Sequence, residues 1–243
     1  MKERLDVLLV NKGLASTRSK AQSMIKGQNV FVDKKPVTKP GLTYDDELVQ
    51  ITVKEDALKY VSRGGLKLEG AIESFGLDLA GKVCMDIGSS TGGFTDCMLQ
   101  NGAAKVIAVD VGSNQLDAKL RNDDRVVVME QTNFRYLTKD DIGQDIDFAS
   151  CDVSFISLDK ILPNAYALLQ NHGLMVCLVK PQFEAGRENI GKGGIVRDKK
   201  IHEKVITRVT EFAEETGFKV CGITDSPITG GDGNKEYLML LEK

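Results

Sequence analysis

The chain has 243 residues, of which 42% are hydrophobic, and a formal net charge of −3 at pH 7. This length suits one large domain or a small module joined to a medium-sized one. The longest apolar run, residues 174–179, is far shorter than the roughly 20 residues that span a bilayer, so no transmembrane helix is expected. The N-terminus lacks the long apolar segment of a secretory signal, and a cytoplasmic protein is therefore expected.

Cysteine and histidine are scarce, which narrows the possible chemistry. The cysteines lie at wide, irregular spacings that indicate reduced thiols; they are Cys84, Cys97, Cys151, Cys177 and Cys221. The chain has two histidines, His172 and His202. A structural zinc site or a serine or cysteine triad is therefore disfavoured, and no metal is expected. Catalysis would have to use carboxylates, lysines, hydroxyls or a cofactor.

Charge is unevenly distributed along the chain. Residues 1–60 carry eleven Lys and Arg against eight Asp and Glu (+3), and the remainder carries twenty-one against twenty-seven (−6). A basic head on an acidic body fits a nucleic-acid-binding appendage, although a bias of this size also occurs on ordinary soluble surfaces.

The head begins with two predicted helices and a hairpin. Leucines at positions 5, 8 and 9 indicate an amphipathic helix from Arg4 to Asn11, closed by Gly13. A second helix has Ala21, Met24 and Ile25 on its apolar side and ends at Gly27. The stretch "NVFVDKKPVTKPG" then predicts two strands joined by a polar turn at 33–35.

The order of these features carries a resemblance. "RLDVLLVNKGLASTRSKAQSMIKGQNVFVDKKPVTKPG" resembles the small RNA-binding domain first described in a ribosomal small-subunit protein, also called the alpha-L motif. The resemblance implies an α+β domain over residues 1–59 that binds structured RNA by shape and phosphate contacts. The alternative is a solvated helix face followed by a charged hairpin. The candidate RNA contacts are Arg4, Arg18, Lys20, Lys26 and Lys34.

Over residues 51–65 the last strand of the head passes into a linker, and the body (60–243) then alternates apolar strand-like runs with helical patterns. Strands are predicted at 83–88, 105–111, 125–130, 146–154 and 174–180, and helices at 94–102, 114–120, 158–170 and 199–216. This alternation predicts an α/β fold, with a mainly parallel, Rossmann-like sheet covered by helices on both faces. The last two strands, 219–226 and 235–243, are separated only by "PITGGDGN" and should form an antiparallel hairpin, which suits methyltransferases better than dehydrogenases.

A glycine-rich turn, "DIGSSTGGFTDC", follows the first strand of this sheet and opens its first helix. Gly88, Gly92 and Gly93 allow a ligand to approach the backbone, but their spacing misses the G-x-G-x-x-G fingerprint of dinucleotide-binding proteins. Asp110 ends the next strand, twenty-two positions after Gly88, where the ribose hydroxyls of an adenosine-containing ligand are expected.

A second glycine-rich stretch, "GRENIGKGG", is a near P-loop from Gly186 to Lys192. Gly193 occupies the place of the Ser or Thr that would hold magnesium. We interpret it as a basic loop whose Arg187 and Lys192 face RNA phosphates; an ordinary surface loop is an equal alternative.

Four polar residues lie where strands begin or end, or just before the sheet: Lys67, Asp152, Lys180 and Glu236. Ligands bind at the carboxyl ends of strands in such sheets. Taken singly, each residue is better explained as a solvated strand boundary or a helix cap.

Together, "DIGSSTGGFTDCML" and these four residues, in this order, resemble the FtsJ-type RNA 2′-O-methyltransferases and their Lys-Asp-Lys-Glu tetrad. With the head included, nearly the whole chain is similar to the TlyA family, also labelled haemolysin A. "GSSTGG" departs from the proline-containing loop that is common in FtsJ-type enzymes. The resemblance implies S-adenosylmethionine as cofactor and ribosomal RNA or ribosomal subunits as partner, with a cytidine ribose as the target.

The tetrad suits ribose methylation, because a 2′-hydroxyl needs a base whereas the sulfonium methyl needs an in-line approach. Lys180 is the candidate base; it must be neutral to accept a proton, and repulsion from Lys67 and the sulfonium favours that form. Asp152 would orient Lys180 or the methyl donor, and Glu236 would position Lys67 and the ribose.

The predicted cofactor residues follow from the same resemblance. The methionine end of the cofactor is assigned to the glycine turn and the residues beside it: Asp86, Gly88, Ser90, Gly92, Gly93 and Phe94. The ribose is assigned to Asp110, and the adenine to Asn133 and Phe134, which follow the third strand.

Two other functions compete with the enzyme. A membrane-active haemolysin is poorly supported, because the chain has no long apolar segment, no strongly basic amphipathic helix and an acidic body. A catalytically idle RNA-binding assembly factor would use the same fold as a scaffold, and the intact tetrad argues against it.

Overall fold

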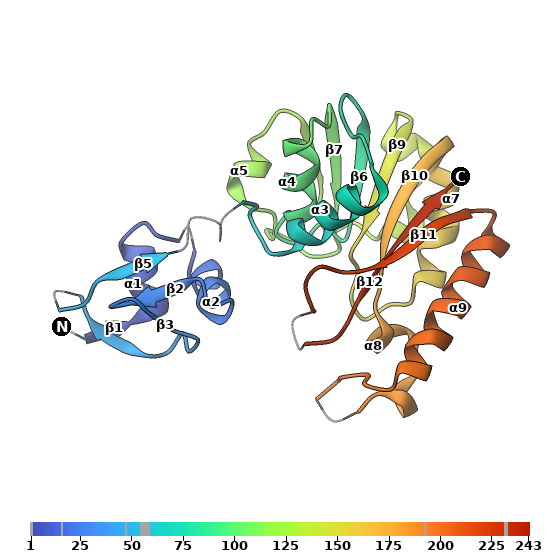
Figure 1. Cartoon of the computed structure of the whole chain (residues 1–243). Helices are drawn as coiled ribbons and strands as arrows, with labels where there is room; N and C mark the ends of the chain where they lie inside the picture. Colours follow the sequence, from blue (N-terminus) through green and yellow to red (C-terminus); the bar gives the residue numbers. More distant parts are fainter. Residues whose placement is uncertain (1, 16, 47, 54–58, 192, 231–232) are drawn as a thin grey trace. The chain divides into compact units, whose positions relative to one another are not determined.

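The structure, a computed structural model, describes residues 2–15, 17–46, 48–53, 59–191, 193–230 and 233–243. By internal contacts the chain divides into two compact units, Met1–Ser62 and Arg63–Lys243 (Figure 1). Each unit has a hydrophobic core of its own.

The first unit contains the two predicted helices and the predicted hairpin. Its elements are β1 (Lys2–Arg4), α1 (Leu5–Asn11), α2 (Arg18–Lys26), β2 (Val30–Val32), β3 (Lys35–Pro36), β4 (Thr43–Asp45) and β5 (Ile51–Val53). β1 pairs with β4, and β2 lies between β3 and β5. The turn between β2 and β3 places Asp33 and Lys34 at positive φ, as a two-residue hairpin turn requires. Strand β1 was not predicted, and it places Arg4 directly before α1 rather than inside it.

The second unit is the predicted α/β domain. Its seven-stranded sheet has the order β11-β12-β10-β9-β6-β7-β8, in which β6 to β10 run parallel and β12 runs antiparallel to both β10 and β11. The predicted terminal hairpin is therefore confirmed. The strands are β6 (Val83–Ile87), β7 (Lys105–Val109), β8 (Val126–Met129), β9 (Ile146–Cys151), β10 (Leu169–Val179), β11 (Lys219–Asp225) and β12 (Tyr237–Glu242).

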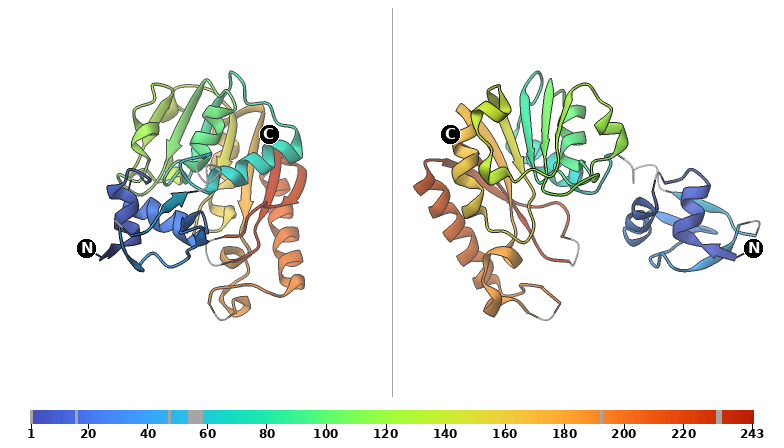
Figure 2. Two further views of the ribbon diagram at one scale, coloured as in Figure 1. Left: turned by 60° about the vertical axis from the view of Figure 1, so that its left-hand side comes forward. Right: turned by 180° about the vertical axis from the view of Figure 1, so that it is seen from behind.

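Helices cover both faces of this sheet (Figure 1 and Figure 2). They are α3 (Gly64–Phe75), α4 (Gly93–Gln100), α5 (Ala118–Arg121), α6 (Lys139–Ile142), α7 (Leu162–Leu168), α8 (Pro181–Glu184) and α9 (Lys199–Thr216), with 3-10 turns η2 (Phe134–Tyr136), η3 (Leu158–Lys160) and η4 (Arg187–Asn189). Alternate residues of the central strands pack with α7 and α9 in one core, whereas α3 and α4 pack together over the other face.

Three helices differ from the predictions. α3 was not predicted because its sequence begins with two glycines and contains Gly70, and glycine disfavours helix. At Gly70 a Cβ would lie 2.7 Å from a ring carbon of Pro227, so this glycine allows a close approach. The helix predicted at 158–170 ends at Leu168, because Leu169 already pairs with β9, and the helix predicted at 114–120 is shortened to α5.

The strand order predicts where a ligand would bind. From β6 the chain moves outward through β7 and β8, and it then returns to the other side of β6 to form β9 and β10. The direction of winding reverses between β6 and β9, and ligands bind outside the carboxyl ends of strands at such a point. Because β12 is antiparallel, its first residues lie at this same edge, with Tyr237 opposite Val179.

Candidate active site

The glycine turn after β6 needs left-handed backbone at three positions. Gly88, Ser90 and Gly92 have φ of +82°, +48° and +92°. A Cβ on Gly88 would lie 2.9 Å from the carbonyl oxygen of Asp152, and one on Gly92 would lie 2.3 Å from a methyl carbon of Leu120. Glycine is therefore required at both positions, for conformation and for space.

Asp86 lies in β6 directly before this turn, and its assignment as a cofactor-binding residue stays a prediction. Its carboxylate is fully buried and accepts hydrogen bonds from Thr95 N (2.9 Å), Thr95 Oγ1 (2.7 Å) and Ser150 Oγ (3.2 Å). Burial raises the pKa of Asp86 to about 7. The residue positions the N-terminus of α4 from below.

This raised pKa makes the stability of the domain depend on pH. The native state holds the Asp86 proton more tightly than the unfolded state does, so the contribution of Asp86 to stability falls as the pH rises from about 4 to about 7. Asp86→Asn, which resembles the neutral acid, should lack this loss. Urea unfolding followed by circular dichroism at pH 4 to 8 should therefore show the wild type losing stability relative to the variant as the pH rises. A difference that does not change with pH would contradict the assignment.

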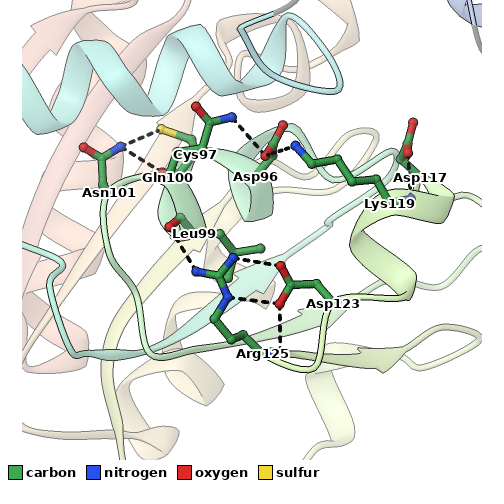
Figure 3. A network of polar contacts seen from close by, with 9 residues as sticks. All are labelled: Asp96, Cys97, Leu99, Gln100, Asn101, Asp117, Lys119, Asp123 and Arg125. Atoms are coloured by element: carbon green, nitrogen blue, oxygen red, sulfur yellow. Dashed lines mark hydrogen bonds and ion pairs between the residues drawn. The ribbon is translucent and has the colours of Figure 1, made fainter.

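Helix α4 is anchored on its other side by a polar network, shown in Figure 3. Asp96 Oδ1 accepts hydrogen bonds from Gln100 Nε2 (3.0 Å) within α4 and from Lys119 Nζ (3.4 Å), and the second of these links the first turn of α4 to α5. Arg125 donates to Leu99 O (3.4 Å) and pairs with Asp123. These contacts fix α4 against the segment that leads into β8, and so they hold the glycine turn from the helix side.

Asp110 follows β7 and joins two loops. Its oxygens accept hydrogen bonds from Ser90 N (2.8 Å) and Gly112 N (2.7 Å), so it holds the glycine turn against the loop after β7. A carboxylate has about four lone-pair sites, which leaves capacity for ribose hydroxyls. The neighbouring Val111 is 72% exposed.

Three other side chains predicted to bind the cofactor make contacts within the protein, and their assignment to the cofactor stays a prediction. Phe94 and Phe134 are buried, and Phe134 belongs to the main core. The Asn133 side chain accepts from Arg135 N and caps η2. The loop after β7 is instead shaped by Glu130, which the sequence analysis missed: it accepts from the backbone N–H groups of residues 114–116.

The four tetrad candidates form one continuous chain of contacts. Lys180 Nζ lies 2.5 Å from Asp152 Oδ1, and Lys67 Nζ lies 3.5 Å from Asp152 Oδ2 and 2.7 Å from Glu236 Oε2. Asp152 and Lys180 follow β9 and β10, Glu236 directly precedes β12, and Lys67 lies in α3. Strand order thus brings together residues that are up to 169 positions apart.

The charges in this cluster alternate. Asp152 lies between the two ammonium groups, so its negative charge offsets the repulsion that is expected between Lys67 and Lys180. Lys67, Lys180 and Glu236 are buried, whereas the Asp152 side chain is 21% exposed. The cluster is therefore accessible from the side of Asp152.

Neighbouring groups extend the cluster, and sequence reasoning missed them. Lys180 Nζ also donates to Val153 O (2.8 Å) and Ser154 Oγ (3.2 Å), and Gln182 Nε2 donates to Glu236 Oε1 (3.2 Å). Their only signal in the sequence is their position one or two residues from a tetrad member.

Phe155 is the most exposed large hydrophobic side chain at this site. It is 91% exposed, has a φ of +63°, and its ring centroid lies 4.9 Å from that of Phe183. Lys180 Nζ lies 5.7 Å from the centre of the Phe183 ring. An exposed aromatic ring at a strained backbone position next to catalytic candidates points to a functional role.

The predicted RNA contacts lie in the first unit and in the loop after α8. Arg4 and Arg18 both pair with Asp6, and the side chains of Lys26 and Lys34 are exposed, whereas Lys20 is half-buried. Arg187 begins η4, and Lys192 lies outside the described residues.

Family comparisons match both units. Residues 60–243 match a family described as FtsJ-like methyltransferase, and residues 3–48 match the S4 domain. The chain is 55% identical to YqxC of Bacillus subtilis, named provisionally as an rRNA methyltransferase, over 99% of this chain and 85% of that protein. It is 42% identical to the 16S/23S rRNA (cytidine-2′-O)-methyltransferase TlyA of Mycobacterium tuberculosis, over 98% of this chain and 89% of TlyA.

Solved structures agree with these matches. A structure from Streptococcus thermophilus, named provisionally as a hemolysin, is 53% identical with a TM-score of 0.80 and covers 100% of this chain and 88% of its own. A structure from Listeria monocytogenes, named provisionally as an S-adenosylmethionine-dependent methyltransferase, shares the fold at 17% identity, with a TM-score of 0.55 over 74% of this chain and 98% of its own. Among the described residues, no helix is long and apolar enough to cross a membrane.

Proposed function

The chain belongs to the FtsJ-like methyltransferase family and carries an S4 domain before its methyltransferase domain, and from this we propose that it methylates the 2′-hydroxyl of a ribose in ribosomal RNA, with S-adenosylmethionine as methyl donor. The relatives named for cytidine 2′-O-methylation favour a cytidine as the target. The single observation that carries the proposal is the contact chain Lys180–Asp152–Lys67–Glu236 at the carboxyl edge of the sheet.

The residues beside this cluster fit S-adenosylmethionine. Gly88 and Gly92 allow the tight turn at positive φ, and α4 begins at the turn, where a helix N-terminus favours the carboxylate of a methionine moiety. Asp110 offers lone pairs for ribose hydroxyls, and Val111 offers apolar surface for a base. When bound, S-adenosylmethionine supplies an electrophilic methyl group on a sulfonium.

Lys180 is the residue placed to take the proton of the ribose hydroxyl. As an ammonium group it donates to three acceptors, Asp152 Oδ1, Val153 O and Ser154 Oγ. As a neutral amine it has two N–H donors and one lone pair, so one of these contacts must give way to the substrate hydroxyl. The contact with Ser154 is the longest of the three and is therefore the one expected to give way, which leaves the lone pair of the amine for the ribose hydroxyl.

Lys67 and Glu236 act as a positioning pair in this scheme. Glu236 fixes Lys67 at 2.7 Å, and Lys67 in turn holds the far oxygen of Asp152. The pair thereby fixes the carboxylate that orients Lys180. Gln182 holds the second oxygen of Glu236 and completes the support.

Phe155 is proposed to hold the target base. Its exposed ring lies two residues from Val153, whose carbonyl binds Lys180, so a base stacked on this ring would bring its ribose towards the amine. Base stacking on an aromatic ring contributes roughly 1–3 kcal/mol. Phe155→Ala is therefore expected to lower kcat/KM for RNA by about 10- to 100-fold, while Phe155→Tyr keeps most activity. Calorimetric titration should give an unchanged affinity for S-adenosylmethionine; equal activity of the alanine and tyrosine variants would contradict this role.

The proposed function is tested by methyl transfer from labelled S-adenosylmethionine to ribosomal subunits that lack their own modification. A 2′-O-methyl group removes the nucleophile that cleaves the adjacent phosphodiester in alkali, so the labelled nucleotide should be recovered in an alkali-resistant dinucleotide. Label on a base, or no transfer despite cofactor binding, would overturn the proposal. The second result would favour an RNA-binding assembly factor.

A further inference from the structure

Several side chains of the head converge on a fully buried carboxylate, that of Asp6. Asp6 lies in the first turn of α1 and is 0% exposed. Its oxygens accept hydrogen bonds from Arg4 Nε (2.9 Å), Arg4 Nη2 (3.0 Å), Arg18 Nε (3.0 Å) and Gln22 Nε2 (2.7 Å). The Arg4 guanidinium, more than any other neighbour, lowers the pKa of Asp6, so the carboxylate is charged at neutral pH.

This carboxylate joins three elements. Arg4 ends β1, Asp6 lies in α1, and Arg18 and Gln22 lie one turn apart on α2. The two arginine side chains nevertheless remain 46% and 56% exposed. One buried negative charge therefore holds two exposed positive charges, and the group as a whole keeps an excess of one.

We propose that Asp6 is a positioning residue for RNA recognition: it holds the Arg4 and Arg18 guanidinium groups in one fixed arrangement that captures neighbouring phosphates of folded RNA. This inference rests on the proposed binding of ribosomal RNA by the S4 domain. The contacts with Asp6 use two of the five N–H donors of Arg4 and one of those of Arg18. A guanidinium can bind a phosphate with its other donors in a planar, bidentate geometry.

Preorganisation explains why two arginines share one carboxylate. An arginine side chain that is free in solution loses rotamer entropy when it binds a phosphate, whereas one that is already held loses little. A fixed pair of charges also favours an RNA whose phosphates have a matching spacing. A single-stranded RNA adapts to either a fixed or a free pair, so it should benefit less.

The test compares two substitutions that remove the same charge from the head. In the wild type four donors converge on the two oxygens of Asp6, whereas Asp6→Asn leaves one acceptor oxygen at this position. The variant therefore frees at least one guanidinium. Asp46→Asn breaks the exposed Lys12–Asp46 pair (2.7 Å) and does not touch the arginines. RNA affinity is measured on the full-length protein with a structured ribosomal RNA fragment and with a single-stranded RNA of equal length, at several salt concentrations.

Long-range electrostatics and positioning predict opposite results for Asp6→Asn. The added positive charge alone would strengthen binding in both variants. If Asp6 positions the arginines, Asp6→Asn weakens binding of the structured RNA by about tenfold and changes single-stranded binding by less than about twofold. Asp46→Asn then gives equal or slightly tighter binding. Tighter binding by Asp6→Asn, or equal losses on both RNAs, would overturn the inference.

A measurement on the wild type covers the case in which Asp6→Asn fails to fold. The Nε–H groups of Arg4 and Arg18 should give separate, slowly exchanging signals in nitrogen-edited NMR spectra, and these signals should shift on addition of the structured RNA. Averaged, rapidly exchanging signals would overturn the inference while leaving RNA methylation intact. A wild-type protein that binds no RNA would overturn both this inference and the proposed function of the head.

Discussion

Lys180→Ala is expected to lower the rate of methyl transfer to RNA by about 10²- to 10⁴-fold, the usual contribution of a general base. The variant removes the only tetrad amine that contacts Asp152 Oδ1, and alanine cannot take the proton of the ribose hydroxyl. Asp152 keeps Lys67 as a partner at 3.5 Å, so its charge stays compensated and the fold should survive. Single-turnover transfer measured with labelled S-adenosylmethionine isolates this step from product release.

Two controls separate loss of a base from loss of structure. Calorimetric titration should show unchanged binding of S-adenosylmethionine, since the glycine turn and Asp110 do not contact Lys180 in the described part of the chain. Lys219→Ala removes a lysine that also pairs with a carboxylate, Glu242 at 3.0 Å, but at the opposite end of the same sheet. That control should retain full activity. Turnover of Lys180→Ala within about tenfold of wild type would remove Lys180 as the base.

The order of elements and the meeting of Asp152, Lys180 and Glu236 were predictable because both depend on strand ends, whereas Lys67, in α3, was identified only through the family resemblance. Apolar runs that alternate with helical patterns indicate a parallel sheet, and the carboxyl ends of parallel strands meet at one edge. Asp152 and Lys180 follow the neighbouring strands β9 and β10, so topology alone brings them close together, whereas the 2.5 Å contact depends on the directions of their side chains. Glu236 joins them because a short hairpin makes β12 antiparallel.

The direction of individual side chains was not predictable in the same way. Successive residues of a strand face opposite sides, and a loop has no such period. Asp86 and Phe134 were assigned to a ligand by their place in the sequence, which did not reveal that both side chains are buried, one against α4 and the other in the core. Phe155 was overlooked because a phenylalanine after a buried strand suggests core, and only its exposed ring shows otherwise.

Gly88→Ala is expected to impair stability, cofactor binding and catalysis together. At a φ of +82° an alanine costs roughly 1–2 kcal/mol, and its Cβ would lie 2.9 Å from Asp152 O and 3.1 Å from a methyl carbon of Val153. Overpacking of this kind costs roughly 1–3 kcal/mol more. The segment 152–153 must therefore shift, and it carries two of the acceptors of Lys180.

A matched substitution separates these effects. Gly143 also has a positive φ, +66°, but a Cβ there meets nothing within 4 Å. Gly143→Ala therefore costs only the free energy of placing an alanine in the left-handed backbone conformation. Urea unfolding should show a larger loss of stability for Gly88→Ala than for Gly143→Ala. Single-turnover transfer should fall by about 100-fold for Gly88→Ala alone, because a displacement of about 1 Å at a catalytic group can cost that much. If both variants kept wild-type transfer rates, the segment 152–153 would tolerate displacement, and its rigid hold on Lys180 would not contribute to catalysis.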